Sequence, residues 1–519
     1  MAHNEDTRVK IPALLHLTRL GYTYFSLKDS SYTIDWETNI LINIFRDQFL
    51  KINKMSDKSE DDLKVFENEF QNMSLELWQD DLWKQFYNRL LNKWNSNYKL
   101  IDRDNFNNNT FHVCTELTCK NWEDEFRPDI TVFVNGLPLS FIEVKKPNNH
   151  EGIRAERDRI NTRFKNSAFR KFINITQLLV FSNNMEYDDT GIDQLQWAFY
   201  ATTTRNSSIK FNNFREELKS ELIDNIQDIN VDIEDFILKD TNYSTLKYSP
   251  EFKTNKDINR PTNRILTSLF TKSRLQMILQ YTLVYIDETN KIWELMIQKH
   301  IMRYPQFFAM KAIEQQLNQW EKRWIIWHTQ WSGKTALAFY SVRYLTDYFS
   351  KRKIVPKFYF VVDRLDLLTQ TEREFRKRWL KVHIVNNKQD LVQDFRKNTS
   401  NEWITVINIQ KFNEDTTVFN DSGYDIAVQR IYFVDEAHRS YDPKGSFLAN
   451  LYNSDKDAIK IALTGTPLIM YNDHKKIDDE ETDLEDKADL KTTRNIFGNY
   501  MHKYYYNSSF ASSSWDFNT

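Results

Sequence analysis

Five short apolar segments, separated by stretches of helical character, follow one another in the second half of the chain. They read "WIIWHT", "KFYFVVD", "WITVINI", "RIYFVD" and "KIALTGT". Each has the length and the β-branched or aromatic content of a buried strand. Strands that alternate with helices form mostly parallel sheets with helices on both faces. The second half is therefore expected to be a doubly wound parallel-sheet lobe.

A smaller α/β pattern lies between residues 126 and 183. Strand-like "DITVFV", the turn "NG" and strand-like "LSFIEV" precede the basic helical stretch "EGIRAERDRINTRFKNSAFRKF" and then strand-like "ITQLLVFSN". Aromatic-rich helical segments occupy much of residues 1–110. We expect an α/β domain with a helical N-terminal part at 1–235, a polar linker at 236–262 and the second lobe at 263–519.

Composition limits the class of protein. The 519 residues are 40% apolar and include only nine glycines and ten prolines, which predicts more than one well-ordered core. No apolar run approaches the roughly 18 residues that span a bilayer, and the start "MAHNEDTRVK" lacks the apolar core of a secretion signal. A cytoplasmic protein without a membrane partner is expected. Cys114 and Cys119 are too few to close a structural zinc site, so reduced thiols are expected.

Charged side chains interrupt an otherwise apolar strand at "SFIEVKK". Glu143 and Lys145 are two residues apart and project from one face, whereas Ile142 and Val144 project from the other. Asp129 begins the preceding strand. Two carboxylates and a lysine at one sheet edge suit phosphodiester hydrolysis, with the carboxylates as Mg²⁺ ligands and the lysine acting on the attacking water. The alternative is an edge strand whose charged face simply meets solvent.

The two carboxylates share a face in only one register of the hairpin. A regular two-residue turn at Asn135-Gly136 would set Asp129 opposite Ile142, on the buried face. One more residue in the connection, or an equivalent β-bulge, sets Asp129 opposite Glu143 instead. We predict the second arrangement, with both carboxylates near enough to share one metal ion.

Three strings in the second half carry the chemistry of nucleotide hydrolysis. "HTQWSGKTALAFY" runs from a strand into a helix, as in a phosphate-binding loop, where backbone N–H groups cradle phosphates, a lysine reaches the terminal ones and a hydroxyl binds Mg²⁺. In "RIYFVDEAHRS" a strand ends in two acidic residues, which suit holding Mg²⁺ and polarising water. "IALTGTP" ends a further strand. The candidate nucleotide-site residues are Thr329, Gly333, Lys334, Thr335, Asp435 and Glu436.

The string "RPDITVFVNGLPLSFIEVKKP" resembles the PD-(D/E)xK nuclease superfamily, and within it the nuclease region of the restriction (motor) subunit of type I restriction enzymes. The resemblance implies Asp129, Glu143 and Lys145 as the catalytic triad. A glutamate on a preceding helix often joins this site in the family, and Glu37 in "IDWETNILINIF" is the candidate. The family's glutamine and tyrosine, four apart on the next helix, are absent from the basic "RDRINTRF". That helix either contacts phosphate or presents a solvated face.

The strings of the second half resemble superfamily 2 helicases and translocases, and the same restriction-subunit family carries them after its nuclease. "RYPQFFAMKAI" is similar to the adenine-recognising segment, which implies Gln306 as the base reader. "FVVDRLDLLTQ" and "ITVINIQKF" are similar to strand-end elements that contact nucleic acid or couple it to the ATP site. The resemblance implies ATP and Mg²⁺ as cofactors, double-stranded DNA as substrate, and methyltransferase (modification) and specificity subunits as partners.

Two departures from the family affect the motor. Trp331 stands where the family's phosphate loop has a glycine, so weak ATP binding is expected, and improved binding in Trp331→Gly. The chain stops about 50 residues after "LTGTP", without a second RecA-like lobe, which indicates a truncated subunit that has lost ATP-driven translocation. The alternative function is a non-catalytic module that binds DNA or the methyltransferase. A DNA repair nuclease-helicase would differ in lacking a methyltransferase partner.

Overall fold

The computed structural model of the protein divides into two compact units, one up to Tyr304 and one from Pro305. Each unit is described by itself. The structure describes residues 5–79, 84–92, 97–120, 125–145, 152–184, 198–204, 208–218, 225–258, 262–289, 295–329, 332–396, 404–408, 428–436, 455, 457–465 and 497–504.

A seven-stranded mixed sheet forms the centre of the first unit, in the order β1-β4-β7-β8-β9-β10-β11. The β4, β7 and β8 strands are antiparallel, whereas β8 and β9 run parallel. Every residue of β8 is buried, which follows from its place in the middle of the sheet. The strands are β1 (Thr23–Tyr24), β4 (Phe111–Thr115), β7 (Ile130–Val134), β8 (Leu137–Val144), β9 (Leu178–Ser182), β10 (Ala198–Ala201) and β11 (Asn212–Asn213).

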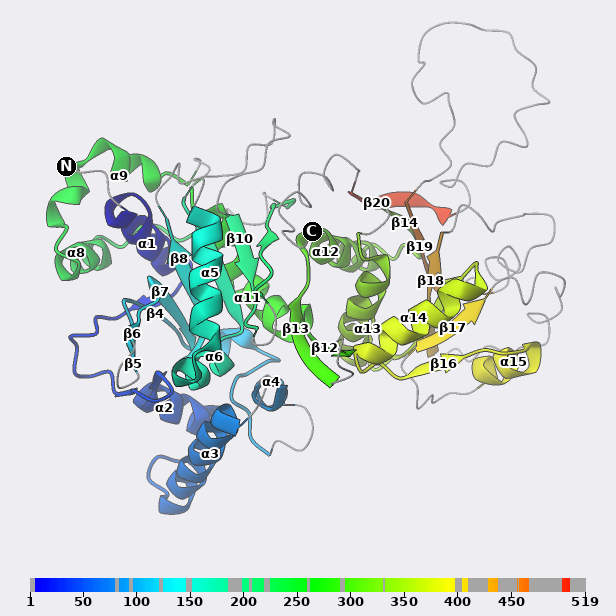
Figure 1. The fold of residues 1–519 in the computed structure, drawn as a ribbon, viewed down its shortest axis with the longest axis horizontal. Helices are drawn as coiled ribbons and strands as arrows, with labels where there is room; N and C mark the ends of the chain where they lie inside the picture. Colours follow the sequence, from blue (N-terminus) through cyan, green and yellow to red (C-terminus); the bar gives the residue numbers. More distant parts are fainter. Residues whose placement is uncertain are drawn as a thin grey trace, which may run out of the picture. The chain divides into compact units, whose positions relative to one another are not determined.

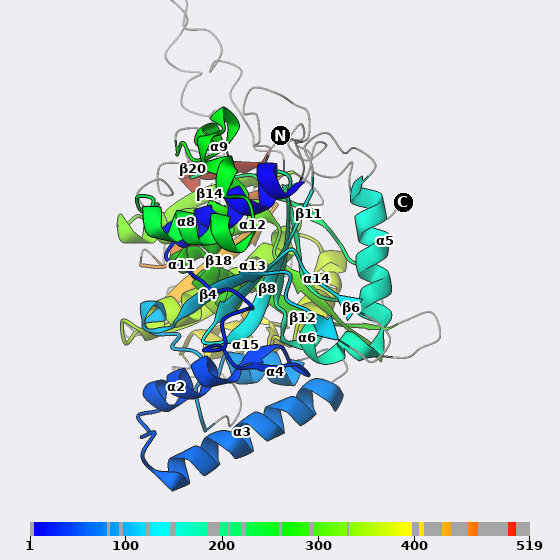
Figure 2. The ribbon, with the colours of Figure 1, turned by 90° about the vertical axis from the view of Figure 1, so that its left-hand side faces the viewer.

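Helices cover both faces of this sheet. Figure 2 shows α5 and α6 on one side and α1 and α8 on the other, with the α2–α3 pair below. The helices are α1 (Ile11–Arg19), α2 (Ile42–Ile52), α3 (Glu60–Gln79), α4 (Lys84–Leu90), α5 (Gly152–Lys165), α6 (Arg170–Ile175), α8 (Val231–Asp240), α9 (Pro250–Asn255), α10 (Arg264–Phe270) and α11 (Lys272–Met277). Three two-stranded ribbons complete the unit: β2 (Ile34–Asp35) with β3 (Ile40–Leu41), β5 (Cys119–Lys120) with β6 (Glu125–Phe126), and β12 (Leu283–Thr289) with β13 (Leu295–Ile301).

The division between the units differs from the linker expected at 236–262. That segment contains the end of α8 and all of α9, and the first unit continues beyond it to Tyr304. Its polar residues serve as helix caps, since the Ser249 side chain accepts a hydrogen bond from the Phe252 N–H at the start of α9. Among its apolar residues, Leu246 and Phe252 are buried, whereas Phe236, Tyr248 and Ile258 are exposed. Polar composition here reflects short capped helices.

The second unit contains a seven-stranded sheet in which each described strand pair is parallel, in the order β16-β17-β15-β18-β19-β14-β20. The strands are β14 (Arg323–His328), β15 (Val355–Val362), β16 (Val382–Ile384), β17 (Ile404–Asn408), β18 (Val428–Asp435), β19 (Ile459–Thr464) and β20 (Asn499–Tyr504), and the helices are α12 (Tyr304–Asn318), α13 (Lys334–Ser350), α14 (Leu365–Lys377) and α15 (Lys388–Arg396). Figure 1 shows α13 and α14 running along the sheet.

Aromatic pairs show that helices pack on both faces of the second sheet. Phe360 of β15 meets Phe375 of α14, with ring centroids 5.3 Å apart. The next residue back, Tyr359, meets Phe395 of α15 at 5.5 Å on the other face. The fold class expected from the alternating pattern is thus confirmed: an α/β nuclease-like domain is followed by one RecA-like doubly wound lobe.

Among the described residues, no helix combines the length and the apolar character needed to cross a bilayer. Cys114 and Cys119 are both free and buried. Burial raises the pKa of the Cys114 thiol, which makes it a poor nucleophile or metal ligand.

Buried His16 predicts acid sensitivity of the first unit. Its Nε2 lies 2.7 Å from the Thr267 Oγ1, and burial together with the positive charge of Arg19 lowers its pKa from 6.5 to about 3. The unfolded chain takes up this proton near pH 6.5 but the folded chain does not, so stability present above pH 6.5 is lost as pH falls toward 3, by at most about 1.4 kcal/mol per pH unit.

We therefore expect His16→Gln to reduce the pH dependence of α1 stability between pH 6.5 and 5. Hydrogen exchange of α1 peptides, followed by mass spectrometry and corrected for intrinsic rates, measures this dependence. The same pH dependence in both proteins would contradict the prediction.

Candidate nuclease and nucleotide sites

The hairpin between β7 and β8 has the register that brings the two acidic residues face to face. Val134 pairs with Leu137 across a two-residue turn in which Asn135 and Gly136 both have positive φ, 53° and 79°. The register then shifts, because two residues of β8 stand opposite one of β7 before Val132 pairs with Ser140. Beyond the bulge Ile130 pairs with Ile142, which continues to Asp129 opposite Glu143.

The bulge prediction is confirmed, whereas the three-residue connection offered as its first form does not occur. The physical reason is the buried turn. A Cβ on Gly136 would lie 2.6 Å from the Leu41 carbonyl oxygen, and Asn135 exchanges hydrogen bonds with the backbone of Thr110. The turn is held tight by these contacts, so the extra residue sits inside β8, where Pro138 has no N–H to contribute to the ladder.

Asp129 is anchored directly beside the β8 charges. Its Oδ2 accepts a hydrogen bond of 2.8 Å from the Val144 N–H, the residue between Glu143 and Lys145. Lys145 in turn donates its N–H to the Ser182 carbonyl oxygen of β9 at 3.0 Å. All three residues of the predicted triad therefore come together at the end of β8.

Glu143 is nearly fully buried, at 1% exposure, and faces two arginines of α5. Its Oε2 accepts from Arg159 Nη2 at 3.1 Å, and its Oε1 lies 3.5 Å from Arg163 Nη1. Burial, and next the charge of Asp129, raise the pKa of Glu143 well above its ordinary value, while Arg159 opposes this shift. The basic side of α5 thus faces the carboxylates, and Arg159 and Arg163, four apart, share that face.

Two further acidic residues join the cluster and were not singled out from the sequence. Glu156 of α5 is 3% exposed, accepts from Arg159 and lies 3.5 Å from Lys145 Nζ. Glu5, at the N-terminus of the first helical segment, lies 3.7 Å from the same Nζ. The signal for Glu156 was its i,i+3 spacing to Arg159 on a helix that directly follows β8.

Glu37, the glutamate expected from a preceding helix, lies elsewhere. It precedes α2 rather than standing on a helix, is largely exposed and pairs with Lys171 of α6 at 2.6 Å. This pairing lowers the pKa of Glu37. Among the described residues Glu5 approaches the triad lysine instead, from the helical segment that leads into α1.

The carboxylate pair is compatible with a divalent cation. Within the described residues, no set of three or more His, Cys, Asp or Glu side chains is already arranged as a metal site. However, the buried Oε1 of Glu143 accepts no hydrogen bond from them, and Asp129 repels the charged form of Glu143. A hard cation between two carboxylates would relieve both features, with water and substrate oxygens as its remaining ligands.

The second unit brings its predicted residues to one edge of the sheet, where the carboxyl ends of β14, β18 and β19 meet. Lys334 begins α13, and its Nζ donates to Glu436 Oε1 at 2.8 Å. Asp435 ends β18, and burial raises its pKa to about 6 while Lys334 opposes this shift. Thr335 is half-buried in the first turn of α13, and the Thr329 N–H donates to the Tyr504 carbonyl oxygen at 3.2 Å.

Gln306 of α12 contacts the phosphate-loop backbone. Its Nε2 donates to the Ser332 and Gly333 carbonyl oxygens at 3.2 and 3.1 Å. Gly333 has a φ of 82°, a backbone conformation that favours glycine, and a Cβ there would displace the Gln306 side-chain amide. Trp331 lies outside the described residues.

These observations define the class as a nuclease-like α/β domain followed by a RecA-like ATPase lobe. Comparison with known families agrees. Residues 2–206 match the family described as "Type I restriction enzyme R protein N terminus", and residues 305–513 match the family described as "SWI2/SNF2 ATPase". The predicted resemblance to the restriction subunits of type I restriction enzymes is confirmed.

Curated relatives carry names from the same enzymes. The chain is 25% identical to the putative type I restriction enzyme MjaIXP endonuclease subunit of Methanocaldococcus jannaschii, over 96% of this chain and 44% of the relative. It is also 25% identical to the type I restriction enzyme SauMSSORF170P endonuclease subunit of Staphylococcus aureus, over 97% of this chain and 46% of the relative. The chain thus spans less than half the length of these relatives.

Solved structures show more distant likeness. The ATP-dependent Type ISP restriction-modification enzyme LlaBIII bound to DNA is 16% identical, with a TM-score of 0.30, over 43% of this chain and 16% of that one. The Sulfolobus solfataricus SWI2/SNF2 ATPase core in complex with dsDNA is 17% identical, with a TM-score of 0.23, over 31% of each chain.

Proposed function

We propose that the first unit hydrolyses phosphodiester bonds of double-stranded DNA at Asp129, Glu143 and Lys145. The observation that carries the proposal is the bulged register of β7 and β8. A regular hairpin would have separated the carboxylates, whereas the bulge aligns them on the face that carries Lys145. The match of residues 2–206 to the family described as "Type I restriction enzyme R protein N terminus" supports the same assignment.

Asp129 and Glu143 would hold Mg²⁺, which when bound supplies positive charge to the scissile phosphate and to the attacking water. Lys145 would donate to that water and orient it. Glu156 and Glu5, 3.5 and 3.7 Å from its ammonium, would hold the lysine in place. Arg159 and Arg163 would bind phosphate oxygens as the substrate enters, because their guanidinium groups already face the same carboxylate.

For the second unit we propose ATP binding at the loop before α13. Lys334 would contact the terminal phosphates, Thr335 and Asp435 would hold the accompanying Mg²⁺, and Glu436 would polarise the attacking water. Gln306 would read the adenine. The ion pair between Lys334 and Glu436 supports this, because it joins the phosphate loop to the end of β18.

In the whole protein, we propose that ATP-driven DNA translocation is coupled to cleavage in a complex with methyltransferase and specificity subunits. The curated relatives are named as endonuclease subunits of type I restriction enzymes, which supports an enzyme of more than one subunit. The alternative, a non-catalytic module that binds DNA or the methyltransferase, is less favoured because the triad is complete and aligned.

Incubation of the chain with supercoiled plasmid tests the nuclease directly. We expect nicking and linearisation that require Mg²⁺ and stop with EDTA. DNA binding without any cleavage over a range of Mg²⁺ concentrations would favour the non-catalytic module instead.

The position of the helical glutamate gives a separate prediction. We expect Glu5→Gln to slow nicking roughly tenfold, because mutation of a residue that positions a catalytic group typically lowers activity by about ten- to a hundredfold. Glu37→Gln, which removes only an exposed pair with Lys171, should leave the rate within about twofold. Nicking rates on supercoiled plasmid compare the two, and a larger loss in Glu37→Gln would reverse the assignment.

A further inference from the structure

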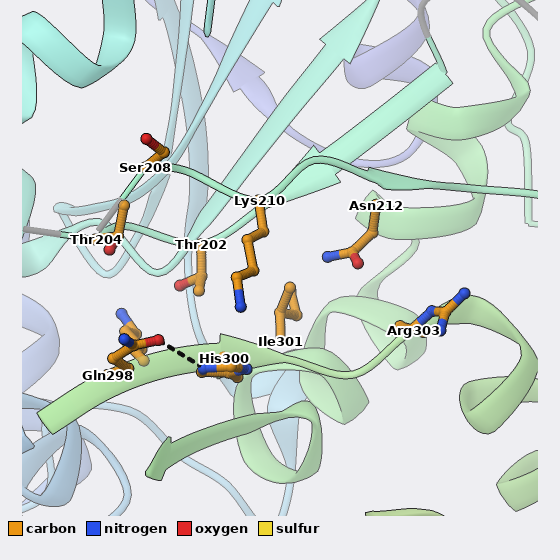
Figure 3. A pocket seen from close by; sticks show the side chains of 10 residues that line it. Thr202, Thr204, Ser208, Lys210, Asn212, Gln298, His300, Ile301 and Arg303 are labelled. Carbon is orange, nitrogen blue, oxygen red and sulfur yellow. Dashed lines mark hydrogen bonds between the residues drawn. The ribbon is translucent and has the colours of Figure 1, made fainter. Parts of the chain in front are cut away.

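A second polar cavity lies in the first unit, at a distance from the carboxylate cluster. Its volume is about 230 Å³, and Figure 3 shows it between the segment after β10 and the end of β13. Thr202, Thr204 and Lys210 line one side, and His300 and Arg303 line the other. Lys210 extends from its own wall toward His300 across the cavity.

The lining is rich in hydrogen-bond donors and positive charge. It includes two lysines, an arginine and a histidine, together with three hydroxyl and two amide side chains, and none of the described lining residues is acidic. Lys299, which also lines the cavity, is buried, and its Nζ donates to Gln177 Oε1 at 2.7 Å. Because carboxylates are lacking from this lining, the cavity favours an anion over a cation or a neutral ligand.

The cavity is distinct from the proposed nuclease site. Thr202 follows Ala201, which pairs with Leu179 near the start of β9. Glu143 instead pairs with Phe181 near the end of β9. The two sites therefore lie toward opposite ends of the same strands. Most of the cavity also falls between the two family matches, which end at residue 206 and begin at 305.

We propose that this cavity binds a phosphate group, with Lys210 and Arg303 as its principal cationic contacts. The size suits a phosphate with part of an attached sugar and is below that of most cofactor sites. A phosphate of this kind comes either from a nucleic-acid backbone or from a small free phosphate compound. Neither the phosphate site nor the source of its phosphate depends on the nuclease activity.

Calorimetric titration of the full chain with inorganic phosphate, in EDTA, tests the site. We expect saturable binding that weakens about tenfold in Lys210→Gln, because a charge-assisted hydrogen bond is lost. Arg303→Gln is the second variant, and should weaken binding similarly. Lys239→Gln, on the exposed side of α8 in the same unit, is the matched control and should bind as the parent does.

Binding of a short DNA duplex over a series of salt concentrations, also in EDTA, identifies the source of the phosphate. If Lys210→Gln lowers the slope of log affinity against log salt by about one, the site holds a backbone phosphate. If the slope is unchanged while inorganic phosphate binding is lost, the site holds a small phosphate compound. Absence of saturable phosphate binding, or parental affinity in both variants, would overturn the proposal. Since no step needs Mg²⁺ or cleavage, these results are independent of the nuclease test.

Discussion

Lys145→Ala is expected to abolish DNA cleavage while the protein still binds Mg²⁺. The lysine acts on the attacking water, so its loss should slow nicking by roughly a hundredfold or more. The carboxylates remain, so Mg²⁺ titration by calorimetry should give an affinity close to that of the parent. Asp129→Ala and Glu143→Ala should instead lose cleavage and metal binding together, because each removes a hard oxygen ligand.

Controls separate chemistry from folding in this series. Lys165→Ala removes an exposed lysine from the last turn of α5 and should cut at the parental rate. Removal of Glu143 also leaves Arg159 and Arg163 without a carboxylate they contact, so Glu143→Gln, which keeps the side-chain volume, accompanies it. Parental nicking by Lys145→Ala would refute the triad assignment.

In the second unit, Lys334→Ala is expected to weaken nucleotide binding by about a hundredfold or more. The ammonium is the group placed to meet the terminal phosphates at the start of α13, and a charged contact of this kind is the strongest that the loop offers. Titration with a fluorescent ATP analogue measures the change. Lys351→Ala, at the other end of α13, is the matched control and should bind like the parent.

Glu436→Gln is expected to change affinity in the opposite direction. Glu436 pairs with Lys334 at 2.8 Å, so a phosphate that binds Lys334 would compete with this carboxylate. Glutamine at this position keeps a neutral acceptor but removes the competing charge, and we expect roughly three- to tenfold tighter binding of the analogue. Weaker binding in Glu436→Gln would contradict the competition, and unchanged binding in Lys334→Ala would contradict the phosphate-loop assignment.

Lys334 and Glu436 also show how the nucleotide site depends on strand order. Lys334 follows β14 and Glu436 follows β18, and β19 lies between these two strands in the sheet. The two residues are 102 positions apart in the chain. Their meeting was predictable because parallel strands place their carboxyl ends at one edge. The same argument could not predict that Gln306 would contact the Gly333 carbonyl, since that contact depends on where α12 packs.

Local pattern was enough to predict both α/β units and, within their seven-stranded sheets, three strands of the first and five of the second. Alternating apolar segments and helices defined the second sheet, and the period-two pattern of Glu143 and Lys145 placed both on one face of β8. The pairing of Asp129 with Glu143 was predicted from counting along the hairpin, and the β7–β8 register confirms it. These features depend on residues that are close together in the sequence, so the sequence alone is enough to predict them.

Only the tertiary structure decided the form of the bulge, the partners of Glu143 and the end of the first unit. The tight turn depends on the distant Leu41 and Thr110, which surround Asn135-Gly136. Glu5 rather than Glu37 approaches Lys145 because of how the N-terminal helix packs. The sequence around Arg159 does not show whether this side chain faces solvent or a buried carboxylate. Contacts between different segments of the chain decide this, and here Arg159 pairs with Glu143.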